Sequence, residues 1–130
     1  MPVMAPSSPG DVVDRLTILD VKLAKLLSED KKEMVKLERD RLVMAWSESC
    51  FGRLTDAIDR EWKDLREVNM RLWDLEDMAR DPKSRGNDAL MASILRCISS
   101  ENDLRAKLKH RINVVLDADF MEVKEHAATR

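Results

Sequence analysis

The chain of 130 residues contains little of what sheets, tight turns and metal sites are built from. It has no tyrosine, two phenylalanines, three glycines, four prolines, two cysteines and two histidines. So few aromatic and turn-forming residues disfavour a sheet protein. Neither the histidines, His110 and His126, nor the cysteines, Cys50 and Cys97, have the spacing of zinc ligands. The sequence therefore indicates neither a β-fold nor a zinc site.

Extended apolar and basic segments are also missing. No apolar run approaches the length that spans a bilayer, and residues 1–9 lack the basic and apolar regions of a signal peptide. The net charge is −2, and acidic residues alternate with basic ones, so no basic stripe suited to nucleic acid is present. The three glycines are isolated, which excludes a glycine-rich phosphate loop. We expect a cytoplasmic protein with reduced cysteines that binds neither nucleic acid nor membrane.

What is present is typical of amphipathic helices, since 37% of the residues are charged and 44% are hydrophobic. We expect an all-α fold in a single domain over residues 1–130, with an irregular lead at 1–7. Ser8 can cap the first helix, with Pro9 at its first position and Asp11 in its first turn. Its expected buried face has heptad spacing and consists of Val12, Leu16, Leu19, Leu23 and Leu26.

Two longer helical patterns follow, over about 53–80 and 88–116, with Pro82 and Gly86 between them. Long helices joined by a short loop pack as an antiparallel hairpin. We therefore expect an antiparallel helical bundle dominated by this hairpin, with two N-terminal helices packed on it. Residues 117–130 are expected to form an extended C-terminal arm.

Polar side chains interrupt the apolar face of the hairpin. Asn69 and Glu76 lie one heptad apart on it, and an unpaired buried carboxylate costs several kcal/mol. The groups expected to converge are Asp20, Asn69, Glu76, Glu101, Asn102 and Arg105. Three interpretations stay open: a structural network that fixes helix register, a ligand or metal site, or a helix rotation that leaves these groups in solvent.

A metal site here would use oxygen donors without histidine, which favours Mg²⁺ or Mn²⁺. The candidate ligands are Asp20, Glu76 and Glu101. Such a site would suit a hydrolase of a nucleotide or nucleotide-sugar phosphate, with Lys22 or Arg105 offsetting the phosphate charge. All-helical metal-dependent nucleotide pyrophosphohydrolases use a similar donor set, which could be imitated here by Glu61, Asp64, Glu76, Asp77 and Asn102. Their paired-glutamate motif is absent.

Trp73 lies four residues after Asn69 and four before Asp77, so the three share one edge of a helix. Two interpretations are possible for this tryptophan. It packs in the core with its indole N–H on a carboxylate, or it offers a stacking platform to a sugar or a base.

Three segments of the sequence resemble motifs of a bacterial and viral all-helical family of unknown function, family 6165, and they occur in the same order as in that family. They are Pro9 to Lys22, Asn69 to Asp77 and Glu122 to His126. The middle segment reads Asn-x-x-Leu-Trp-x-x-Glu-Asp, a motif that a related uncharacterised family shares. The resemblance implies an all-helical fold, no established activity, and an accessory role in glycan or nucleotide-sugar metabolism. The motif residues that it carries over are Asp14, Thr17, Asp20, Lys22, Asn69, Trp73, Glu76, Asp77, Lys124 and His126.

Together these observations favour a cytosolic helical binding or assembly protein. Its amphipathic helices are longer than 130 residues can easily cover, so we expect a homo-oligomer. A nucleotide-sugar or a protein would be its partner. The alternatives are a Mg²⁺- or Mn²⁺-dependent hydrolase and a virus-encoded structural component.

Overall fold

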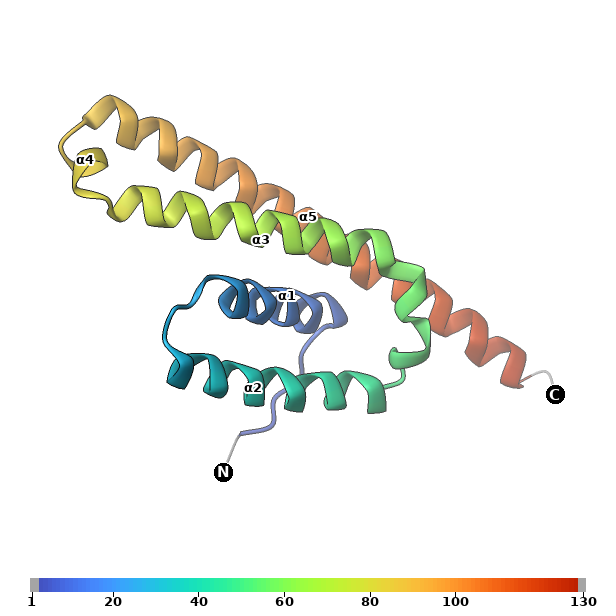
Figure 1. The fold of residues 1–130 in the computed structure, drawn as a ribbon. Helices are drawn as coiled ribbons and strands as arrows, with labels where there is room; N and C mark the ends of the chain where they lie inside the picture. The colour runs from blue at the N-terminus through green and yellow to red at the C-terminus, as the bar shows by residue number, and fades with distance from the viewer. Residues whose placement is uncertain (1–2, 129–130) are drawn as a thin grey trace.

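The computed structural model describes residues 3–128, with side chains for residues 3–117 and 119, and within that range it contains helices and no strand. The all-α prediction is confirmed. The elements, labelled in Figure 1, are α1 (Pro9–Lys25), α2 (Glu29–Glu48), the 3₁₀ helix η1 (Gly52–Ile58), α3 (Asp59–Arg80), α4 (Pro82–Arg85) and α5 (Asp88–Ala128). No helix in the described range is both long enough and apolar enough to cross a membrane.

The two longest helices, α3 and α5, run side by side in opposite directions and are connected through the single turn of α4 (Figure 1). Helix α1 packs against both of them and also against α2. Helix α2 packs mainly on α1 and η1, and Trp46 near its end also contacts Trp62 on α3, with ring centroids 5.7 Å apart. Helix α1 is therefore the central element, with α2 on one side and the α3–α5 pair on the other.

The start of α1 follows from its local sequence. The backbone N–H of Asp11 donates to the hydroxyl of Ser8 at 3.2 Å, and Pro9 occupies the first helical position. This arrangement satisfies one of the N–H groups that a helix N-terminus leaves without a partner. The capping prediction for Ser8 is confirmed.

Two predicted boundaries are wrong. Residues 52–58 form a 3₁₀ helix, so α3 begins at Asp59 and not near residue 53. The last helix does not end near residue 116: it continues to Ala128, and residues 117–128 are helical and not an extended arm. The chain has no glycine or proline after Gly86, so no helix-breaking residue ends α5 earlier.

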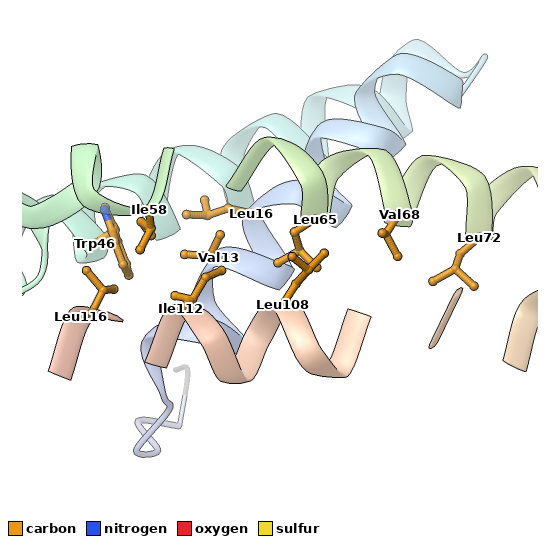
Figure 2. Close-up of a cluster of buried hydrophobic side chains, with 10 residues drawn as sticks. All are labelled: Val13, Leu16, Trp46, Ile58, Leu65, Val68, Leu72, Leu108, Ile112 and Leu116. Carbon is orange, nitrogen blue, oxygen red and sulfur yellow. The ribbon is translucent and has the colours of Figure 1, made fainter. Parts of the chain in front are cut away.

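The core lies where α1, α2, η1, α3 and α5 meet, and Figure 2 shows its side chains pointing into the space between these helices. Its buried members are Val13, Leu16, Trp46, Ile58, Leu65, Val68, Leu72, Leu108, Ile112 and Leu116. Burying each aliphatic side chain of this size stabilises the fold by about 1.5–3 kcal/mol. On α3 the core ends at Leu72, so the last two turns of α3 lie outside it.

Candidate functional site

Four polar side chains meet at the centre of the molecule, and we call them the polar cluster: Asp14, Thr17, Asn69 and Arg105. Asp14 on α1 accepts two hydrogen bonds from Arg105 on α5, from Nε at 2.9 Å and from Nη2 at 2.6 Å. Asn69 on α3 donates through Nδ2 to Asp14 Oδ1 at 3.0 Å and to Thr17 Oγ1 at 2.8 Å. The cluster therefore connects α1, α3 and α5 at one carboxylate.

Burial makes this connection strong. The Asp14 side chain is only 7% exposed, and Thr17 and Asn69 are buried. The hydrogen bonds to Asp14 raise the pKa of Arg105 above its ordinary value, against the opposing effect of burial, and the charges of Asp14 and Glu76 add to the increase. Arg105 is therefore a fixed positive charge, held in one orientation by a bidentate pair.

Two clefts flank the polar cluster. The larger, of about 380 Å³, is lined by Ser7, Asp11, Val12, Asp14, Arg15, Ile18, Leu19, Lys22, Glu38, Leu42 and Arg105. The smaller, of about 200 Å³, is lined by Ile18, Val21, Lys22, Asn69, Leu72, Trp73, Glu76 and Arg105. Ile18, Lys22 and Arg105 belong to both linings, so the two clefts are neighbours with a shared wall.

Within the smaller cleft, Trp73 and Lys22 both have unused polar groups. Trp73 is half-buried, and its indole N–H donates no hydrogen bond to any described residue. The predicted bond from this indole to a carboxylate is absent among the described residues. Lys22 is also half-buried, and its ammonium forms no ion pair within the described range. An indole donor on α3 and a cation on α1 thus line the same cleft.

Glu76 lies at the edge of this cleft and not in the core, which for this residue agrees with the interpretation that leaves the polar groups in solvent. Its side chain is 53% exposed, and Oε2 lies 3.7 Å from Arg80 Nη2. The reason is the length of α1, which ends at Lys25, whose Nζ lies 2.8 Å from Asp74 Oδ1. Helix α1 therefore does not continue along α3 past the contact between Lys25 and Asp74. Asp77 is likewise exposed and lies 3.6 Å from Arg80.

The three candidate metal ligands do not converge. Asp20 accepts from Arg39 Nε at 2.6 Å and from Arg66 Nε at 3.3 Å. Glu101 accepts from Arg71 Nε at 3.0 Å. Glu76 is held near Arg80, so each carboxylate has its own arginine. No group of three histidine, cysteine or acidic side chains within the described range could hold one metal ion.

The remaining predicted residues lie apart from the polar cluster. Asn102 is exposed on α5. Glu61 is buried and accepts from Arg111 Nε at 3.0 Å. The side chains of Lys124 and His126 lie outside those that the structure describes, so the predictions for them are not tested here.

The cleft residues that the predicted site does not include are, among others, Arg15, Ile18 and Glu38. Arg15 on α1 pairs with Glu38 on α2 across the larger cleft. The sequence does contain a pattern that indicates the cleft wall, in the spacing of Asp11, Arg15, Ile18 and Lys22. Intervals of four, three and four residues place all of them on one face of α1. This face would have identified the cleft wall from the sequence.

The Asp11–Lys109 ion pair predicts a response to acid. Lys109 Nζ lies 2.9 Å from Asp11 Oδ1, and this hydrogen bond holds the pKa of Asp11 below its ordinary value. A carboxyl whose pKa is lowered on folding stabilises the protein above its unfolded pKa, and this contribution is lost as the pH falls below about 4. We expect Asp11→Asn to flatten the loss of stability between about pH 4 and pH 2 in urea unfolding. An acid limb as steep as that of the wild type would contradict this assignment.

The fold and the polar cluster define a small all-α protein in which three helices are joined at a buried carboxylate beside two clefts. The chain belongs to DUF6165, described as a family of unknown function, whose model matches residues 4–129. The family resemblance of the three sequence segments is thereby confirmed. No curated protein and no solved structure matches the chain significantly.

Proposed function

We propose that this protein is a helical binding protein, accessory to glycan or nucleotide-sugar metabolism, and that its ligand is a phosphorylated sugar such as a nucleotide sugar. The observation that carries this proposal is the lining of the smaller cleft, which includes Trp73 together with Lys22 and Arg105. An aromatic surface beside two cations matches a ligand that has both an apolar ring face and an anionic group.

Each side chain has a distinct part in this binding mode. The indole of Trp73 packs on the C–H face of a sugar ring, and its free N–H donates to a hydroxyl group of that ring. Lys22 pairs with no carboxylate among the described residues, so its ammonium is the cation available to a phosphate. Arg105 is already oriented by Asp14, which reduces the entropy lost when a ligand binds beside it.

The sizes of the clefts agree with a ligand in two parts. The cleft of about 200 Å³ suits a single sugar ring, since pockets for larger ligands have volumes of about 300–1,000 Å³. The cleft of about 380 Å³ begins at the shared wall of Ile18, Lys22 and Arg105 and is within that range. A phosphate at Lys22 would therefore lie between a sugar in one cleft and a nucleoside in the other.

The state of the cysteines supports a cytoplasmic location for this protein. Cys50 and Cys97 are both exposed and form no disulfide. Exposed thiols of this kind persist in reducing compartments, whereas oxidising compartments favour disulfides. Nucleotide sugars are then accessible to the clefts from the same compartment.

A thermal-shift titration with uridine diphosphate glucose, glucose 1-phosphate, uridine diphosphate, glucose and inorganic phosphate tests the proposal. A ligand that binds only the native state adds about 2.7 kcal/mol at 100 times its dissociation constant, which raises the midpoint by several degrees. We expect the sugar phosphates to give the largest shifts and glucose the smallest. The absence of a saturable shift with every sugar phosphate would contradict the proposal.

Variants separate specific binding from general charge attraction. Trp73→Leu removes the platform, while Trp73→Phe keeps an aromatic face and loses only the N–H. Lys22→Met removes the available cation. Lys107→Met is the matched control because Lys107 is exposed on α5 and forms no ion pair with a described residue. We expect Lys22→Met and Trp73→Leu to weaken binding at least about tenfold, Trp73→Phe less, and Lys107→Met not at all. Equal binding by Trp73→Leu and the wild type would refute the smaller cleft as the sugar site.

A further inference from the structure

One face of α2 has no partner among the residues that the structure describes. Its contacts with α1 and η1 lie on one side, and among its own residues only Trp46 is buried. Opposite them, Met34, Leu37 and Met44 are 74%, 53% and 63% exposed. Asp30 and Arg41 lie on the same face, are exposed, and form no ion pair within the described range. We call this face the outer stripe, and it consists of Asp30, Met34, Leu37, Arg41 and Met44.

The outer stripe has the periodicity of a helix–helix interface. Its five residues follow one another at intervals of four, three, four and three, which is the heptad spacing of a coiled coil. Exposed apolar residues at this spacing on a helix of 20 residues are typical of a surface that a second helix covers.

We propose that the outer stripe is a homodimer interface in which α2 packs antiparallel on α2 of a second copy of this chain. The argument is charge complementarity. Along the helix, Asp30, Met34, Leu37 and Arg41 are separated by four, three and four residues. This series of spacings is the same when the helix is read in the opposite direction. Antiparallel pairing therefore puts each Asp30 opposite Arg41 of the second copy, and each Met34 opposite Leu37.

The parallel arrangement lacks this match. It would place Asp30 against Asp30 and Arg41 against Arg41, and like charges in facing positions are destabilising. The antiparallel register also gives a partner to Met44, the last residue of the outer stripe. Met44 reaches the start of the second copy's α2, next to which Leu27 is 94% exposed.

Charges beside the outer stripe limit the strength of this dimer. Glu33 and Asp40 are exposed and flank the stripe, and the antiparallel register brings Glu33 of one copy next to Asp40 of the other. This repulsion opposes the two attractive Asp30–Arg41 pairs. We therefore expect a reversible dimer whose population rises with protein concentration, and not a permanent one.

A charge exchange measured by sedimentation equilibrium over a range of concentrations tests the proposal. We expect the wild type to dimerise, Arg41→Asp and Asp30→Arg each to weaken the dimer at least about tenfold, and the double variant D30R/R41D to restore it. Lys36→Asp, an exposed charge change on α2 outside the outer stripe, is the matched control and keeps the dimer. All of these positions are exposed, so circular dichroism should show unchanged helix content.

Other outcomes overturn the proposal. A wild-type monomer at the highest concentration would show that the outer stripe does not pair with itself. A double variant that stays monomeric would refute the antiparallel register, and single variants as dimeric as the wild type would place the interface elsewhere. None of these results depends on whether the clefts bind a sugar phosphate, because no cleft-lining residue is changed.

Discussion

Replacing Arg105 with methionine is expected to lower the free energy of unfolding by about 3 kcal/mol, because it leaves a buried carboxylate without its bidentate partner. Asp14 is 7% exposed, and the hydrogen bond from Asn69 would remain to it. Lys109 lies 3.9 Å from Asp14 and already pairs with Asp11. The remaining contacts therefore compensate the charge only in part. Urea unfolding of the variant and the wild type at neutral pH measures the difference.

Two controls establish that burial causes this effect. Lys63→Met removes an ion pair with Asp59 in which both side chains are about two-thirds exposed, and it should cost less than about 0.5 kcal/mol. The double variant D14N/R105M removes both charges and should be more stable than R105M alone. A cost below about 1 kcal/mol for R105M would show that water reaches Asp14 and that the polar cluster is not sealed.

Gly10→Ala is expected to cost about 2 kcal/mol, because an added methyl group has no space at this position. A Cβ atom on Gly10 would lie 2.4 Å from the backbone oxygen of Lys109 and 2.9 Å from Asn113 Oδ1. The Gly10 N–H also donates to Asn113 Oδ1 at 2.7 Å, which holds the start of α1 against α5. Because the added methyl group would meet the backbone of α5, the steric clash could be removed only if α1 and α5 moved apart. The requirement is steric, since no glycine in the described range has a positive φ.

The matched control for this substitution is Gly86→Ala at the end of α4, where the nearest atom to an added Cβ is 3.6 Å away. Alanine fits there, so its effect should stay within about 1 kcal/mol and stabilise slightly through the unfolded state. Thermal and urea unfolding of both variants make the comparison. If Gly10→Ala costs no more than Gly86→Ala, then α1 and α5 are not in close contact at Gly10.

Local signals in the sequence were sufficient for the helical class and for the cap at Ser8, and they were insufficient for the rotation of α1. The heptad pattern predicts Leu23 and Leu26 in the core, yet both are half-buried, whereas Val13 and Thr17 are fully buried. Helix α1 is covered on two sides, by α2 and by the α3–α5 pair. Periodicity along one helix identifies an apolar face, and it does not show that a second, more polar face is also covered.

For the candidate site too, the sequence was sufficient for some residues and insufficient for others. Asn69 and Arg105 stand out in sequence as polar residues on apolar faces, and the structure places both at Asp14, a residue indicated only by the family resemblance. Glu76 has the same sequence signal and is exposed. What separates Glu76 from Asn69 is where α1 ends, which is a property of a different segment of the chain. A pattern within α3 contains no information about that length.

The polar cluster also sets the time at which the protein can fold during its synthesis. Arg105 leaves the ribosome 91 residues after Asp14. The hydrogen bond of Gly10 requires Asn113, which is 103 residues later. Helix α1 is therefore synthesised well before its partners on α5, so the side of α1 that packs on α5 stays uncovered in the nascent chain until Asn113 has been added. A chain that ends before Arg105 cannot form the pair between Asp14 and Arg105, and a chain that ends between Arg105 and Asn113 lacks the hydrogen bond of Gly10.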